Sequence, residues 1–310
     1  MRMLITGASG FVGGHLAEAL AARGHEPLGL GREAMGGDWL AGYVQADLID
    51  SGATRAAVRD LRPDAVVHLA AAASVAESWR TPAATFDNNT RSALNLLEAV
   101  RAESPDAVVV AAGSGEQYGP VPDDRLPVTE AEPPRPQSPY AASKAAVDLL
   151  AGFYADAHDL RVIRTRAFNH AGPGQADAYV VSAFARQIAD AERAGRSELV
   201  VETGSLEPRR DFCDVRDVAH AYALLVERGQ AGTFNVCSGV SVPVREILAG
   251  LARLTGVAVE QRTDSSRLRE HEVMEIRGSH ERLTDATGWQ PEVALETTLT
   301  DTLDWWRARG

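Results

Sequence analysis

A tyrosine and a lysine near the middle of the chain have the residue types and the spacing of an acid–base pair. Tyr140 and Lys144 stand four residues apart in Tyr-Ala-Ala-Ser-Lys, so a helix would bring both side chains to one face. A free tyrosine loses its proton only near pH ~10, and a neighbouring ammonium lowers that pKa toward the working range of a general acid or base. We therefore predict that Tyr140 transfers a proton and that Lys144 assists it.

Lysine occurs at only one position in the chain. Lysine and arginine together number 31, and Lys144 is the single lysine among them. A compact ammonium differs in geometry from the rigid fork of arginine and can also bond a nicotinamide ribose. An ordinary exposed pair would explain the Tyr/Lys spacing, but it would not explain why the one lysine stands at this position. The count therefore favours a catalytic role.

A serine follows an apolar run upstream of this pair. Ser114 comes shortly after residues 107–112, which predict a buried strand. The C-terminal ends of parallel strands are where such sheets bind ligands. We predict that the Ser114 hydroxyl bonds the same substrate oxygen as Tyr140. The alternative is an ordinary turn serine.

Three regularly spaced glycines lie in the first predicted turn of the chain. Gly7, Gly10 and Gly13 form Gly-x-x-Gly-x-x-Gly, with Phe11 and Val12 between the last two, after a predicted strand and before a predicted helix. Such a turn lets the backbone approach a pyrophosphate, and the helix N-terminus offers it free N–H groups. We predict a dinucleotide site here. A plain strand-to-helix turn is the alternative.

The end of the second predicted strand bears on the choice of cofactor. Arg32 stands where an acid would favour the ribose of NAD and an arginine would accommodate the 2′-phosphate of NADP. NADP(H) is therefore favoured and NAD(H) stays open, because Arg32 could be a solvated loop charge and Glu33 could turn to the ribose. Asp47 and Leu48 suit the adenine edge, with an Asx cap as the alternative.

The elements that must position these residues alternate in type. Apolar runs at residues 3–6, 26–30, 65–69 and 107–112 alternate with helical stretches such as 90–102 and 138–158. Runs that are apolar on both faces predict a parallel sheet covered by helices. We expect an α/β fold: a doubly wound Rossmann sheet, mainly residues 1–168, with a smaller interleaved substrate-binding region, mainly 169–310. The seven prolines of residues 120–139 predict a long surface loop.

Composition narrows the classes of function. Hydrophobic residues make up 45%, the formal charge is −12, and the apolar runs are too short to span a bilayer. The acidic balance argues against a nucleic-acid partner and requires locally basic groups around any anionic ligand. Two cysteines cannot form a disulfide framework, which favours a cytoplasmic protein. Neither a membrane partner nor a metal is expected.

The chain resembles the extended short-chain dehydrogenase/reductases, the family of NAD-dependent nucleotide-sugar epimerases, dehydratases and reductases. Matching stretches run along the chain at residues 7–13, 68–71, 89–99, 114–119, 138–144, 166–174, 210–217 and 234–236. Within the family it is most similar to the reductases of GDP-linked 4-keto-6-deoxy sugars, through residues 168–175, 180–188, 211–217 and 267–273. The last stretch lacks the proline found in that subfamily.

The resemblance implies roles for further residues. The cofactor would also contact a loop at Leu69, Ala70 and Ala71 and a helix at Asn89. The substrate side would consist of Asn169 near the pyrophosphate, Val180 and Arg186, Arg210 and Arg269 on the diphosphate, and Glu272 on the guanine edge. The arginines would supply the basic surroundings that an anionic ligand needs.

The implied reaction is NAD(P)H-dependent reduction of the 4-keto group of a GDP-linked 4-keto-6-deoxy sugar, giving a GDP-D-rhamnose-type product. A 4,6-dehydratase with tightly bound NAD is the alternative, because dehydratases of the family place a catalytic glutamate where Glu116 stands. Gly115 removes the acid or serine that dehydratases generally have beside it. An epimerase is a further alternative, and a non-catalytic dinucleotide sensor is disfavoured by the Tyr/Lys pair. The resemblance also implies a homodimer through a four-helix interface built from helices 90–102 and 138–158. The alternative is that their Ala and Leu residues are buried within the monomer core.

Overall fold

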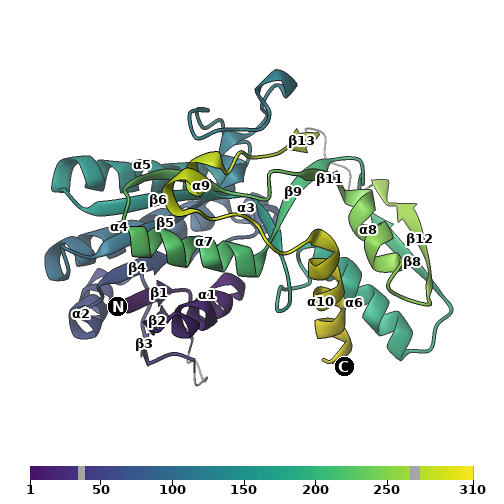
Figure 1. Cartoon of the computed structure of the whole chain (residues 1–310), viewed down its shortest axis with the longest axis horizontal. Helices are drawn as coiled ribbons and strands as arrows, with labels where there is room; N and C mark the ends of the chain where they lie inside the picture. The colour runs from purple at the N-terminus through teal and green to yellow at the C-terminus, as the bar shows by residue number, and fades with distance from the viewer. Residues whose placement is uncertain (34–38, 266–272, 310) are drawn as a thin grey trace.

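The computed structural model describes residues 1–33, 39–265 and 273–309. The chain folds into two lobes that lie side by side (Figure 1). The larger lobe is built around a parallel sheet, and the smaller lobe collects most of the elements from the second half of the sequence.

The large lobe has a seven-stranded parallel sheet in the order β10-β6-β5-β4-β1-β2-β3. Its strands are β1 (Arg2–Thr6), β2 (Glu26–Gly31), β3 (Gly42–Gln45), β4 (Ala65–His68), β5 (Val108–Ser114), β6 (Arg161–Ala167) and β10 (Gly232–Val236). The central strands are apolar on both faces, and β4 is buried at every position. The predicted α/β doubly wound fold is confirmed.

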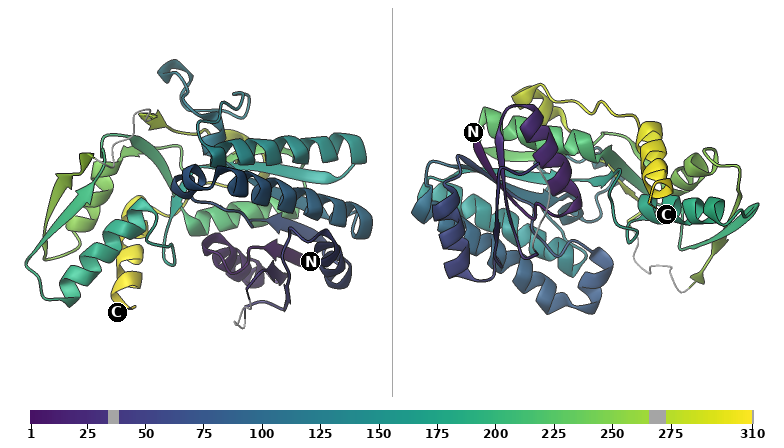
Figure 2. Two further views of the ribbon diagram at one scale, coloured as in Figure 1. Left: turned by 180° about the vertical axis from the view of Figure 1, so that it is seen from behind. Right: turned by 90° about the horizontal axis from the view of Figure 1, so that it is seen from below.

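Helices cover both faces of this sheet, which Figure 2 shows edge-on in its right panel. One face packs against α2 (Ser51–Leu61), α4 (Pro82–Glu103) and α5 (Pro139–His158), and the other against α1 (Phe11–Ala22), α7 (Val215–Arg228) and α9 (Glu281–Thr287). A short helix, α3 (Val75–Arg80), contacts α4 and α5. Two hydrophobic clusters, one on each side of the sheet, form the core of this lobe.

The smaller lobe has its own apolar cluster, in which Phe184 and Ile188 meet Leu251 and Leu303. Its elements are β7 (Asn169–Ala171), α6 (Val180–Arg193), β8 (Glu198–Thr203), β9 (Arg209–Asp214), β11 (Ser241–Pro243), α8 (Val244–Ala252), β12 (Ala258–Thr263), β13 (Glu275–Ile276) and α10 (Leu295–Arg307). Three elements that follow residue 169 in the sequence pack in the large lobe instead: α7, β10 and α9. Residues after 169 therefore contribute to both lobes.

Three local expectations need correction. Helix α4 begins at Pro82 rather than near Thr90, because proline is well suited to the first helical turn. Strand β5 runs through Ser114 rather than ending at residue 112. The proline-rich segment 120–139 is not wholly a surface loop, because Val128 is fully buried and its N–H donates to the Arg277 carbonyl oxygen at 2.8 Å.

Within the described ranges, no helix combines the length and the apolar character needed to cross a membrane.

Candidate active site

The glycine turn lies between β1 and α1 as predicted, and it is tightly folded. Gly7 has a φ of 71°, and the Gly10 N–H donates to its carbonyl oxygen at 2.9 Å. A side chain on Gly13 would collide with that same carbonyl oxygen, so the close approach requires glycine. Helix α1 begins at Phe11 with no side-chain cap at its N-terminus. This turn therefore presents backbone N–H groups and the positive end of a helix dipole to an anion.

The rest of the turn is packed on both sides. Val12 contacts the core beneath the sheet. The Phe11 ring stacks on His170, with ring centroids 6.0 Å apart and an interplanar angle of 10°. His170 belongs to β7 of the smaller lobe, so the first helix and the second lobe meet at the glycine turn.

The proposed proton-transfer groups come together at the C-terminal end of β5. Ser114 is the last residue of that strand, and Tyr140 is the second residue of α5; both are buried. A hydrogen bond joins Ser114 to the Tyr140 phenol and lowers its pKa. Glu116, half-buried in the 3₁₀ helix Gly115–Tyr118, lies close enough for its charge to raise the same pKa. The structure therefore groups Ser114, Glu116 and Tyr140.

The pKa of Tyr140 is raised in the folded chain, so a lowering effect of Lys144 does not dominate it. Burial is the largest influence and raises the pKa of Tyr140 above its ordinary value. Lys144 is itself buried, and its ammonium donates to the Ala112 carbonyl oxygen at 2.7 Å. Burial also lowers the pKa of Lys144 to about 8. The helical spacing places both residues correctly, but loss of solvation determines their proton affinities.

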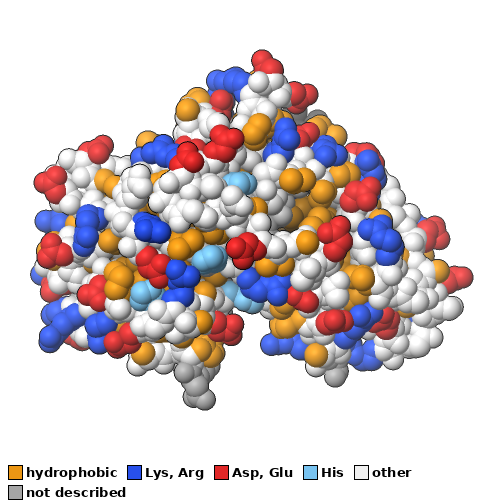
Figure 3. Space-filling view, viewed as in Figure 1, with side chains coloured by type: hydrophobic (Ala, Val, Ile, Leu, Met, Phe, Trp, Pro, Cys, Tyr) orange, Lys and Arg blue, Asp and Glu red, His pale blue; other side chains and the backbone are white. Residues whose placement is uncertain are grey.

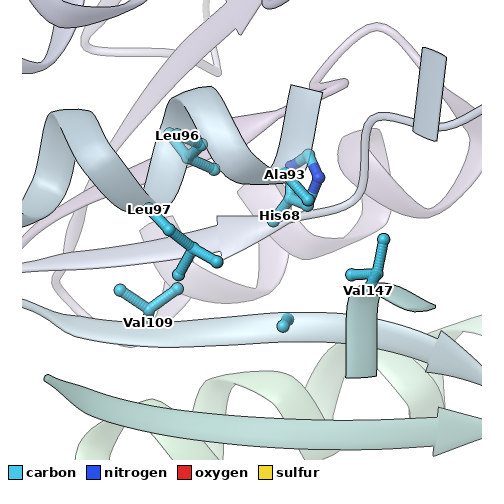
Figure 4. Close-up of a pocket in the computed structure, with 7 residues that line it drawn as sticks. His68, Ala93, Leu96, Leu97, Val109 and Val147 are labelled. Atoms are coloured by element: carbon cyan, nitrogen blue, oxygen red, sulfur yellow. The ribbon is translucent and has the colours of Figure 1, made fainter. Parts of the chain in front are cut away.

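A buried histidine lies beside this group. His68 ends β4, and its Nδ1 is 2.8 Å from the Thr6 hydroxyl. Burial, with a contribution from the Lys144 charge, lowers the pKa of His68 to about 3. The side chain borders a cavity of about 10 Å³ that aliphatic residues of α4, β5 and α5 otherwise line (Figure 4). His68 is therefore uncharged at neutral pH and forms part of the wall of this cavity.

Asn89 is engaged within the protein. Its side-chain amide pairs with both the N–H and the carbonyl oxygen of Ala72, at 2.7 and 3.2 Å, and donates to the Ser143 hydroxyl at 2.9 Å. Ser143 in turn donates to the Tyr140 carbonyl oxygen. Asn89 thus ties the loop after β4, which includes the half-buried Leu69, Ala70 and Ala71, to the first turn of α5.

The residues expected near the adenosine differ in exposure. Arg32 is exposed just beyond β2, and its carbonyl oxygen accepts from Gln45 Nε2 at 2.8 Å. Asp47 is exposed as well, and its carboxylate accepts from the Ile49 N–H at 3.0 Å, which is the Asx turn that the sequence left open. The Leu48 side chain packs in the core, so only its backbone is placed to face a ligand.

The predicted substrate residues lie on the smaller lobe. Asn169 starts β7 and Val180 starts α6, and both are half-buried. Arg210 is half-buried on β9, and its Nη1 donates to the Arg209 carbonyl oxygen at 2.9 Å. Arg186 is exposed and forms an ion pair with Asp177 at 3.0 Å. The predicted residues Arg269 and Glu272 lie outside the described residues.

Sequence reasoning did not single out Tyr179, which precedes α6. An ionised Tyr179 would raise the pKa of the Tyr140 phenol, although the two residues come from different lobes. The space-filling view shows a hollow between the lobes (Figure 3). The sequence signal was slight: an aromatic residue next to Val180, within a stretch already assigned to the substrate. In the described ranges, no cluster of His, Cys, Asp and Glu suits a metal ion.

A Rossmann sheet with a glycine turn, a Ser/Tyr/Lys group and a second lobe facing them defines a dinucleotide-dependent enzyme class. Residues 3–237 match the model of the NAD dependent epimerase/dehydratase family, and the chain belongs to this family. It is 39% identical to a GDP-6-deoxy-D-mannose reductase of Pseudomonas aeruginosa, over 99% of this chain and 98% of that one.

Two solved structures are also similar over nearly the full length. A structure of RMD from Pseudomonas aeruginosa complexed with NADPH has a TM-score of 0.84 and 36% identity and covers 100% of both chains. A Thermus thermophilus UDP-glucose 4-epimerase in complex with NAD has a TM-score of 0.89 and 34% identity and covers 99% of each chain. The family resemblance that the sequence predicted is confirmed.

Proposed function

We propose that the protein reduces the 4-keto group of a GDP-linked 4-keto-6-deoxy hexose, with NADPH as the favoured hydride donor. The observation that carries this proposal is the Tyr140 phenol, which is buried, hydrogen-bonded to Ser114 and placed at the C-terminal end of a parallel strand. The full-length similarity to a GDP-6-deoxy-D-mannose reductase supports the choice of substrate. Residues 1–168 would mainly hold the cofactor, and residues 169–310 mainly the sugar nucleotide.

The protonated Tyr140 phenol suits the proton donor that the reductive step needs. A reductase needs a proton donor for the oxyanion that forms at carbon 4, whereas an epimerase or dehydratase first needs a base to take a hydroxyl proton. Burial raises the pKa of Tyr140, so the phenol keeps its proton at neutral pH. Tyr140 would donate that proton while Ser114 holds the same oxygen. The buried ammonium of Lys144 would stabilise negative charge at this end of the site.

The chain's own groups fit a dinucleotide. The close turn of Gly7 and Gly13 and the uncapped start of α1 suit a pyrophosphate. Arg32 makes no ion pair with any residue that the structure describes, so its guanidinium is available to the 2′-phosphate that distinguishes NADP from NAD. Bound NADPH would supply the hydride. Asn169 and Arg210 would hold the diphosphate of the sugar nucleotide, next to Val180.

A dehydratase is the second candidate, and Glu116 is the observation that favours it. Its carboxylate lies near Tyr140 and is half-buried, which suits a group that removes a proton from the sugar. Gly115 leaves no acid beside it. The missing acid favours the reductase.

The second copy of the chain is the proposed partner in solution. Helices α4 and α5 pack side by side and carry an exposed apolar stripe, with Phe86 44%, Leu94 39%, Leu149 70% and Phe153 55% exposed. Two copies that join these helices would form a four-helix interface and remove the stripe from water.

The test is an absorbance assay of NADPH and then NADH with GDP-4-keto-6-deoxy-mannose. Wild-type protein should oxidise NADPH only when the sugar nucleotide is present, and Tyr140→Phe should lose that activity. Tyr154→Phe is the matched control, because its phenol bonds Glu98 of α4 rather than the site. Protein-bound NAD together with water loss from GDP-mannose, and no NADPH oxidation, would instead establish the dehydratase.

A further inference from the structure

Arg166 is a buried cation on the strand beside β5. It lies on β6, where it pairs with Gly113 of β5, one residue before Ser114. Only 6% of the residue is exposed, and the proposed proton transfer does not use its side chain. A buried guanidinium has lost its hydration and needs partners within the protein, so its contacts show what it holds in place.

One partner of Arg166 belongs to the helix that carries the tyrosine. Its Nη2 donates to Asp148 Oδ2 at 3.0 Å, and Asp148 is buried as well. Tyr140, Lys144 and Asp148 follow one another at intervals of four residues, so the three buried side chains lie along one face of α5. Lys144 independently fixes this face to β5 through the Ala112 carbonyl oxygen. Helix α5 is therefore a firm anchor for the guanidinium.

The other partner belongs to the 3₁₀ helix that follows Ser114. The Arg166 guanidinium lies over the Tyr118 ring, with 4.9 Å between Cζ and the ring centroid. Tyr118 is fully buried, and its phenol donates to Asn235 Oδ1 at 2.6 Å. At the start of the same 3₁₀ helix, the Glu116 N–H donates to the Ser114 hydroxyl oxygen at 3.2 Å. The guanidinium thus contacts the last residue of a short helix whose first turn holds the Ser114 hydroxyl.

We infer that Arg166 is a positioning residue that holds the Ser114 hydroxyl in place relative to Tyr140. This inference rests on the proposed function, in which both hydroxyls hold the carbonyl oxygen of carbon 4. Asp148 anchors the guanidinium on α5, and the guanidinium in turn holds Tyr118 and the 3₁₀ helix. Because rates fall steeply when reacting groups are displaced by about an ångström, a small shift of this helix slows the chemical step.

Arg164 provides a matched control on the same strand. It precedes Arg166 by two residues, so both side chains leave the same face of β6. Its Nη1 is 3.8 Å from the same Asp148 carboxylate, but it lies against Gly152, one turn further along α5. Of these two arginines in the described chain, only Arg166 lies over the Tyr118 ring. Arg164 therefore shares the carboxylate without the contact to the 3₁₀ helix.

The experiment compares Arg166→Lys with Arg164→Lys in assays of NADPH oxidation by the GDP-4-keto-6-deoxy sugar. A lysine keeps a positive charge near Asp148 but has no planar group to cover the Tyr118 ring. Arg166→Lys should lower kcat by roughly tenfold to a hundredfold. It should leave KM for the sugar nucleotide and the dissociation constant of NADPH within about twofold of wild type. Arg164→Lys should match wild type in all three quantities.

A double-mutant cycle separates positioning from a general disturbance of the fold. Ser114→Ala keeps the Tyr140 phenol, so a lower rate should remain to be measured. If Arg166 acts through the Ser114 hydroxyl, the effect of Arg166→Lys on kcat should shrink to about twofold or less in the Ser114→Ala background. An equal loss in both backgrounds would overturn the inference, and so would a kcat of Arg166→Lys equal to that of wild type.

Two further measurements keep the test decisive. If urea denaturation shows that Arg166→Lys does not fold, the combined variant Asp148→Asn/Arg166→Gln removes both charges and leaves no unpaired carboxylate buried. It should show the same loss of kcat, and a wild-type kcat would reject the inference. If wild type oxidises no NADPH with the sugar nucleotide, the proposed function fails, and hydrogen–deuterium exchange then tests the positioning separately. Faster exchange of residues 114–119 in Arg166→Lys than in Arg164→Lys would support it, and equal exchange would reject it.

Discussion

Replacing His68 with asparagine should remove a specific part of the acid sensitivity of the fold. His68 is buried at the end of β4, bonded to Thr6 and close to the charge of Lys144, and its pKa is lowered to about 3. The unfolded chain would bind a proton near the ordinary value of 6.5, but the folded chain would not. The stability that depends on neutral His68 is therefore complete above pH 6.5 and is lost as the pH falls from 6.5 toward 3.

The size of this loss follows from the difference between the two pKa values. A change from 6.5 to about 3 corresponds to about 5 kcal/mol once the pH has fallen through the whole window. Between pH 7.5 and 5, where measurement is easier, the contribution is about 2 kcal/mol. Asparagine does not titrate, and its amide can take the place of the ring nitrogen against the Thr6 hydroxyl.

The assay is urea denaturation at several pH values, followed by the fluorescence of the five tryptophans. His68→Asn should be less stable at neutral pH, because a smaller side chain beside a cavity loses packing contacts. The difference in unfolding free energy between wild type and variant should then shrink by about 2 kcal/mol between pH 7.5 and 5. Parallel losses in the two proteins would show that His68 is not kept neutral by burial, and the reasoning would fail.

Three further outcomes are expected. Since burial lowers the pKa of Lys144 to about 8, kcat/KM of wild type should fall as the pH rises through that value. Lys144→Arg, though much less active, should lack this alkaline fall in its pH profile. A fall that persists unchanged in Lys144→Arg would assign the titration to another group. Arg32→Glu should lower kcat/KM for NADPH by roughly tenfold to a hundredfold while changing the value for NADH little, and equal losses with both cofactors would contradict contact with the 2′-phosphate. Leu149→Asp should convert a dimer to a monomer in sedimentation experiments, because it places a charge within the proposed apolar stripe; a wild-type monomer would remove the stripe's proposed role.

Much of the large lobe was predictable because its signals are local. Strands buried on both faces need continuous apolar runs, as Ala65–His68 shows, and the helices between them need an apolar stripe. The order of the strands and the return of β10 to the edge of the sheet depend on contacts between distant segments. No short stretch of sequence carries that information.

The same distinction applies to the site. The glycine turn and the Tyr140/Lys144 spacing are local patterns, and the structure places both at the ends of the strands. Leu48 was given a ligand role from its position after a strand, but its side chain belongs to the core between α2 and α4. Tyr179 shows no distinguishing pattern of its own in the sequence, because its electrostatic effect on Tyr140 exists only in the folded chain.

The proton affinity of Tyr140 is the clearest case of a property set by tertiary structure. Helical spacing alone pairs Tyr140 with Lys144 and predicts a lowered phenol pKa. In the folded chain the Lys144 ammonium bonds the Ala112 carbonyl oxygen, while burial, together with Tyr179 and Glu116 from other elements, raises the phenol pKa. A phenol that keeps its proton is suited to donate it to a newly formed oxyanion, which is what a reductase requires. The residue pair therefore indicates the family, whereas the proton affinity of Tyr140 depends on distant neighbours that the local pattern does not show.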